Sequence, residues 1–144
     1  MNTLQHITRA LQPIMARALM VLAVLGLGLS TVQASAPIKK STRFENLTIT
    51  PIAVYANDIV NCSATLYYQN KNGKYGPLSY KNVQVEWRID GQPVSVTPTS
   101  KGVATYSFQV PANARKGTHH VEVKFYGDIE LKPCWMTRSF TVLR

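Results

Sequence analysis

The sequence predicts an all-β fold, an antiparallel sandwich of about seven strands in a single domain. After residue 34 no stretch keeps a helical period, and short runs that alternate apolar and polar residues recur with turn-forming residues between them. The clearest run is "VQVEWRID", Val83–Asp90, whose apolar residues all fall on one face and whose polar residues fall on the other. Trp87 sits in the middle of the apolar face, where a sandwich core needs a large side chain.

The expected strands can be justified in order. Pro51 marks the first strand as an edge strand or a bulge, because proline cannot donate to a sheet. Asp90 and Gly91 tolerate positive φ and predict a tight hairpin turn. A small barrel remains the alternative architecture, since alternation alone does not separate the two. The expected strands are Asn46–Val54, Ile59–Tyr68, Val83–Asp90, Pro93–Pro98, Gly102–Pro111, His119–Asp128 and Cys134–Arg144.

A secretory signal peptide is predicted in front of this domain. Arg9 and Arg17 precede the uncharged apolar run "ALMVLAVLGLGLS", and small residues follow it. As a helix the run would rise only about 20 Å, too short for a ~30 Å hydrocarbon core, so no permanent membrane span is expected. We expect cleavage after Ala34. The predicted organisation is a signal peptide at 1–34, an extended segment at 35–45 and the sandwich domain at 46–144.

The expected mature chain, Ser35–Arg144, is strongly basic. It keeps 14 of the 16 Lys and Arg residues and all seven acidic residues, a net charge of +7. Such a surface favours contact with polyanions such as acidic polysaccharide, and it also promotes solubility. The predicted location is secreted or periplasmic.

Several blocks resemble bacterial immunoglobulin-like repeat domains, modules of surface and secreted proteins. The blocks are "VQVEWRIDGQPV", "GVATYSFQVP", "GTHHVEVKFYGD" and "PCWMTRSFTV", in that order from Val83 to Leu143. The resemblance implies an immunoglobulin-like sandwich with a non-catalytic role, and it implies no ligand. Cys134 stands where those domains have a small residue, and Cys62 has no counterpart in the pattern.

The two cysteines predict a disulfide in an exported chain, because an even count in an oxidising compartment usually means pairing. Cys62 and Cys134 both fall on the inward parity of their strands. Strand direction argues against the bond: in an immunoglobulin-like topology the two strands begin at opposite ends, and a disulfide needs Cα atoms within about 7 Å. Free thiols and a covalent dimer are the alternatives.

The adjacent histidines, His119 and His120, raise the question of a metal site. Neighbouring strand residues point to opposite faces, so the two rings cannot converge on one ion without a bulge. We expect His119 at the edge of the core and His120 in water. An alternative is a small periplasmic copper or zinc protein that uses His120, Glu122 and the N-terminal amine.

No catalytic motif or cofactor motif is recognised, so an enzyme is not expected. The candidate binding surface is a rim where the 69–82 loop meets the loop between the last two strands. Aromatic rings flanked by cations on loops of a rigid scaffold suit a sugar or an acidic partner. The expected role is structural, adhesive or binding, with a protein or polysaccharide of the cell envelope and no specific nucleic acid; a loop-presenting inhibitor or accessory subunit is an alternative. The rim residues are Lys71, Lys74, Tyr75, Tyr80, Lys81, Lys132 and Trp135.

Overall fold

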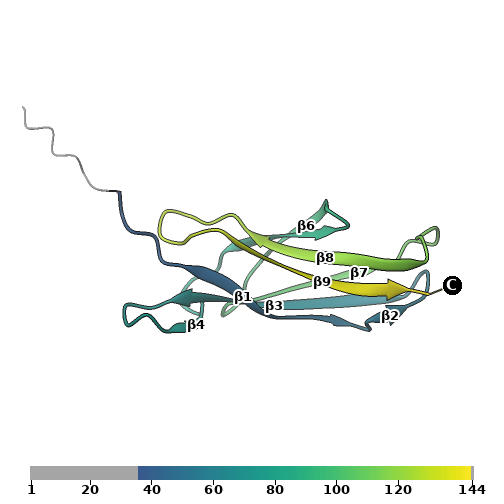
Figure 1. The fold of residues 1–144 in the computed structure, drawn as a ribbon, viewed down its shortest axis with the longest axis horizontal. Helices are drawn as coiled ribbons and strands as arrows, with labels where there is room; N and C mark the ends of the chain where they lie inside the picture. Colours follow the sequence, from purple (N-terminus) through teal and green to yellow (C-terminus); the bar gives the residue numbers. More distant parts are fainter. Residues whose placement is uncertain (1–35, 144) are drawn as a thin grey trace, which may run out of the picture. The chain divides into compact units, whose positions relative to one another are not determined.

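The computed structural model describes residues 36–143, which form nine β-strands in two packed layers (Figure 1). The described residues contain no helix, which confirms the all-β prediction. The predicted signal peptide lies outside the described residues. The strands are β1 Thr42–Thr50, β2 Ala53–Val54, β3 Ile59–Gln69, β4 Tyr75–Pro77, β5 Gln84–Ile89, β6 Gln92–Pro98, β7 Val103–Gln109, β8 Gly117–Phe125 and β9 Cys134–Val142.

The strand order identifies an immunoglobulin-like sandwich. In one sheet β3 pairs with β1 on one side and with both β4 and β7 on the other. The other sheet has the order β2-β9-β8-β5-β6. The chain therefore passes repeatedly from one layer to the other, as in the Greek-key sandwiches of this class. Each sheet is open and antiparallel apart from the short β2–β9 pair, so the barrel alternative is wrong.

The core lies between the sheets and follows the predicted parity. Trp87 is fully buried, and its indole stacks on Tyr106 across the sandwich with ring centroids 5.9 Å apart. Its Nε1–H donates to Thr97 Oγ1 at 2.8 Å, so the one polar atom of the ring is satisfied. The hairpin turn is also as predicted, with Asp90 at φ 49° and Gly91 at φ 80° between β5 and β6.

The first predicted strand is two strands in different sheets. β1 begins at Thr42, inside the segment expected to be extended, and its register shifts around Asn46, which has φ 57°. The chain leaves this sheet at Pro51, and β2 joins the other sheet beside β9. Strand β4 also lies inside the segment expected to be a loop, and it extends the β3 hairpin.

The predicted Cys62–Cys134 disulfide is not formed, and both residues are buried free thiols. The Cys134 thiol lies beside Thr42 and the backbone of Phe44, and Phe44 pairs with Leu66, four residues beyond Cys62 on β3. At about 3.4 Å per residue, the thiols are offset by roughly 13 Å along the sandwich, more than a disulfide allows. Burial raises the pKa of Cys62 to about 11 and raises that of Cys134 as well.

Candidate binding surfaces

The β3–β4 hairpin carries two of the predicted cations on a tightly defined turn. Asn70 Oδ1 accepts from the N–H groups of Asn72 and Lys74 at 2.9 and 3.0 Å, and Asn70 N–H donates to the Lys74 carbonyl. Gly73 takes φ 76° at the bend, a conformation that glycine adopts without strain. The turn therefore holds the exposed side chains of Lys71 and Lys74 outward on a fixed backbone.

The segment before β1 ties this hairpin to the loop between β8 and β9. Lys40 N–H donates to the Glu130 carbonyl at 2.8 Å, and Lys132 N–H donates to the Lys40 carbonyl at 2.9 Å. On its other side the segment accepts a bond from Gln69 N–H at the Ser41 carbonyl. The two loops predicted to meet are thus joined by a third segment that runs between them.

Lys81 links the same loops through its side chain. Its ammonium contacts Asp128 at 2.8 Å and Glu130 at 3.0 Å. Burial opposes the charge, but the bonds to both carboxylates outweigh it and raise the pKa of Lys81. Asp128 also accepts from two backbone N–H groups of its own loop through Oδ1. Lys81 is therefore a structural cation rather than one available to a partner.

Aromatic rings at this end are covered by cations. Tyr80 meets Tyr68 edge to face at 5.1 Å, and Lys40 Nζ lies 5.5 Å from both ring centroids. The Arg43 guanidinium lies 4.0 Å over the Tyr75 ring. These are cation–π distances, and Tyr80 is exposed whereas Tyr68 and Tyr75 are half-buried.

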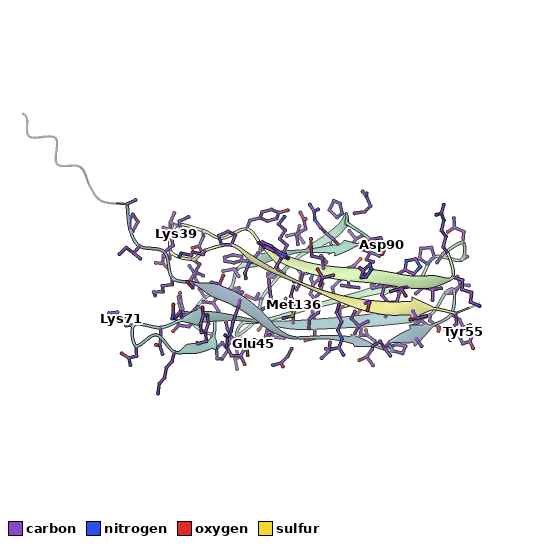
Figure 2. The ribbon with its side chains drawn as sticks, in the orientation of Figure 1. Lys39, Glu45, Tyr55, Lys71, Asp90 and Met136 are labelled. Carbon is purple, nitrogen blue, oxygen red and sulfur yellow. The ribbon has the colours of Figure 1, made fainter. Side chains whose placement is uncertain are left out.

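We call this end of the sandwich the basic rim, made of residues 37–43, 68–75, 79–82 and 127–132. Figure 1 shows the β3–β4 hairpin and the β8–β9 loop at the same end, and Figure 2 places Lys39 and Lys71 there, opposite Tyr55. Six of the seven predicted residues belong to the rim, with Lys71, Lys74 and Lys132 exposed. Within the described residues, Lys39, Lys71, Lys74 and Lys132 have no acidic partner.

Trp135 lies apart from the other six, on the outer face of the five-stranded sheet. It is 65% exposed and stands directly opposite Lys124 in the β8–β9 register. Tyr126 lies on the same face, with Lys124 Nζ 4.8 Å from its ring centroid and its hydroxyl donating to Glu86 at 3.0 Å. Tyr126 and Lys124 were not predicted as neighbours of Trp135, although the alternation of both strands places them on one face.

The rim residues that sequence reasoning missed are Lys40, Arg43 and Tyr68. Lys40 and Tyr68 contact Tyr80, and Arg43 contacts Tyr75. Lys40 and Arg43 fall in the segment expected to be extended, and no local pattern indicates that it runs between two loops. Tyr68 is the last residue of the expected strand Ile59–Tyr68. The alternation of that strand indicates only the face of the sheet on which the side chain lies.

An apolar groove of about 420 Å³ opens between the sheets on the side of β6 and β7. Tyr106 and Phe108 of β7 form its floor as a stacked pair, and Phe108 meets Phe140 edge on. The groove lies toward the end opposite the basic rim. Its lining residues are Ile89, Asp90, Val94, Tyr106, Phe108, Gln109, Val110, Pro111, Asn113, Ala114, His119, Phe140 and Val142.

His119 closes one end of this groove, half-buried as its parity predicts, whereas His120 is exposed. His119 Nδ1 lies 2.6 Å from Asp90 Oδ2 and Nε2 lies 2.7 Å from the Arg115 carbonyl. Both partners only accept, so both ring nitrogens donate, and these bonds raise the pKa of His119. Burial opposes the ionisation of Asp90, but bonds from the His120 N–H and from His119 lower its pKa.

The geometry leaves His119 no lone pair for a metal ion. Among residues 36–143, no group of three His, Cys, Asp or Glu side chains is placed to hold a metal. Within the same residues no helix is long and apolar enough to cross a membrane.

Neither a protein-family model nor a curated protein matches the sequence. Among solved structures, it is similar to an alkylpurine DNA glycosylase of Pseudomonas fluorescens bound to DNA containing an abasic site analog, at 14% identity and TM-score 0.46. That match covers 72% of this chain and 30% of the glycosylase chain, so this chain spans less than a third of it.

Two further solved structures are similar over most of their own length. One is the CARDB domain of a Pyrococcus furiosus protein in complex with di-metal ions, at 10% identity and TM-score 0.41, covering 74% of this chain and 94% of that one. The other comprises fibronectin(III)-like modules of Clostridium thermocellum CbhA, at 16% identity and TM-score 0.37, covering 72% and 99%. The fold assignment rests on the strand order described above.

Proposed function

We propose that this protein is a non-catalytic, secreted or periplasmic immunoglobulin-like module that binds an acidic polysaccharide of the cell envelope through its basic rim. The observation that carries the proposal is the rim itself: exposed lysines without acidic partners and tyrosine rings contacted by cations lie at one end of the sandwich, on loops fixed by hydrogen bonds. The resemblance of the sequence blocks to bacterial immunoglobulin-like repeats supports a binding role over a catalytic one.

Charge and preorganisation support the same reading. The net charge of +7 expected for the mature chain raises the local concentration of any polyanion, and a fixed turn reduces the entropy lost when it binds. Tyrosine rings offer flat apolar surface to the C–H faces of sugar rings while their hydroxyls remain in water. An acidic sugar chain satisfies both features, since it carries rings and negative charge together.

The test compares binding of the protein to dextran sulfate and to neutral dextran. The double variant Lys71→Ala/Lys74→Ala should weaken binding to dextran sulfate and reduce its salt dependence. The matched control, Arg115→Ala/Lys116→Ala, removes the same charge from the loop before β8, at the other end of the sandwich, and should change binding much less. Equal losses in both variants would indicate non-specific attraction and would contradict a rim site.

A further inference from the structure

The strand β7 presents an unpaired edge beside the apolar groove. It hydrogen-bonds to β3 along one side; on its other side, among residues 36–143, only Val103 has a backbone partner, Ser100 of the preceding turn. Gly102 and Val110, at the two ends of β7, direct their backbone groups to Leu66 and to the Asn57–Asp58 turn on the β3 side. The backbone N–H and C=O groups of successive residues point to opposite sides of a strand. Those of Thr105, Ser107 and Gln109 therefore point to the open side.

This edge lacks the features that usually block pairing. Val103–Gln109 contains no charged residue, no proline and no bulge. The neighbouring open edge, β6, has two prolines, Pro93 and Pro98, and an irregular register against β5. The contrast indicates that β6 is protected from pairing and that β7 is available for it.

The side chains of β7 are complementary to those of the same strand in a second copy. An antiparallel pair centred on Ser107 would use all three free backbone positions, with Thr105 opposite Gln109 of the second copy and Ser107 opposite Ser107. On the groove side, Tyr106 would lie opposite Phe108 of the second copy. Each copy would thereby bring its half-buried aromatic pair against the other's, and both grooves would be covered.

Charge favours a second copy as the occupant. The chain has a net charge of +9, so two copies repel each other over most of their surface. The β7 edge is neutral, and in the groove lining the only charged groups are Asp90 and His119, which are paired with each other. Two like molecules can approach there with the least repulsion.

We infer that the protein forms a two-fold symmetric dimer through antiparallel pairing of β7 with β7, centred on Ser107. The contact is isologous, which is the commonest arrangement of soluble homodimers. It leaves the basic rim free, because the rim occupies the other end of the strand layers (Figure 1). The dimer would present two rims at once, and a polymer that reaches both would bind with higher avidity.

The test places charge on the symmetry axis. Ser107 is exposed on the outer face of its sheet, so Ser107→Lys sets two ammonium groups opposite each other across the pair, and Ser107→Asp does the same with two carboxylates. Sedimentation equilibrium from about 1 to about 200 µM should show a concentration-dependent dimer for the wild type and at least about tenfold weaker association for each variant.

A mixture of Ser107→Lys and Ser107→Asp should restore the dimer, since the opposite charges then face each other. Thr137→Lys, on an exposed strand position of the other sheet, controls for added charge and should associate like the wild type. A wild type that stays monomeric throughout, or a dimer that neither variant weakens, would overturn the inference. A mixture that fails to associate would overturn the Ser107-centred register. None of these outcomes depends on binding by the basic rim.

Discussion

The two long edges of the sandwich are closed in different ways. Along the β1 and β9 edge, the chain ties the sheets together at three levels. Lys132 bonds to Lys40 near the rim, Arg138 donates to the Leu47 carbonyl at 2.7 Å in the middle, and Thr141 N–H bonds to Ile52 beyond it. Along the β6 and β7 side, the chain crosses between the sheets at residues 78–83 and again at residues 99–102, and the groove opens beyond the second crossing.

The difference shows how a small sandwich can leave one strand edge, that of β7, available for pairing with another strand. Strand β2 continues the path of β1 onto the other sheet and thereby covers part of the β9 edge. No equivalent segment follows β6, so the interior beside β7 is closed only by side chains, among them Tyr106 and Phe108. Truncating an edge side chain should therefore cost more stability at the first edge than at the second, whereas association should depend on the second.

The largest loss of stability is expected at Trp87. Both strands of the β6 and β7 edge, which we call the open edge, contact this core residue. Trp87 bonds to Thr97 of β6 and stacks on Tyr106 of β7. Trp87→Ala should lower the free energy of unfolding by about 3–5 kcal/mol, because it removes both contacts and leaves a cavity. Urea unfolding followed by circular dichroism measures it. A loss below about 1 kcal/mol would show that the open edge does not depend on this residue.

The same substitution at each edge compares them directly. Phe44, at the β1 and β9 edge that we call the closed edge, is 3% exposed, whereas Phe108 at the open edge is half-buried. Phe44→Ala should cost about 3–4 kcal/mol of unfolding free energy, and Phe108→Ala about 1–2 kcal/mol at concentrations where the chain is monomeric. Equal costs would mean that the two edges are packed alike and would contradict the difference between them.

A smaller, pH-dependent effect is expected at the end of the groove. The folded pKa of His119 is raised, so its contribution to stability is complete below pH 6.5 and is lost as pH rises through the folded pKa. The lowered pKa of Asp90 acts oppositely: its contribution is present above pH 3.8 and is lost as pH falls further. The cations Arg115 and Lys116 on the adjoining loop also influence the midpoint.

The His119→Gln variant isolates this effect. Its unfolding free energy should fall below that of the wild type by under about 1 kcal/mol at pH 6, since Asp90 is partly solvated, and the gap should narrow toward pH 9. His120→Gln, at the exposed neighbouring position, should show no comparable change. A gap that widens with pH would mean that His119 is bound as the neutral ring.

The sequence predicted the parts of the fold that depend on local alternation. Trp87 and the Asp90–Gly91 turn are as expected because period-two burial and positive φ are readable from residue types. The first strand was wrong in its bounds because the bulge at Asn46 breaks the period: Phe44 is buried, and so are Leu47 and Ile49 on the opposite parity.

The contacts that depend on position along the sandwich were less predictable. Parity placed Cys62 and Cys134 on the inner faces correctly. It carries no information on how far apart the two residues lie along the strands, and this separation prevents the disulfide. The meeting of two loops at one end followed from the topology, and the rim was predicted for that reason. The covering of Tyr75 by Arg43 depends on the path of the segment before β1, which no pattern indicates.

The most direct test of the open edge is amide hydrogen exchange along β7, measured by NMR at low and high protein concentration. At low concentration, the amides of Ala104, Tyr106 and Phe108, which bond to β3, should be protected, whereas those of Thr105, Ser107 and Gln109 should exchange rapidly. At high concentration, this second set should become protected while the first changes little. Uniform protection along β7 at every concentration would contradict an edge left open by the chain's own fold.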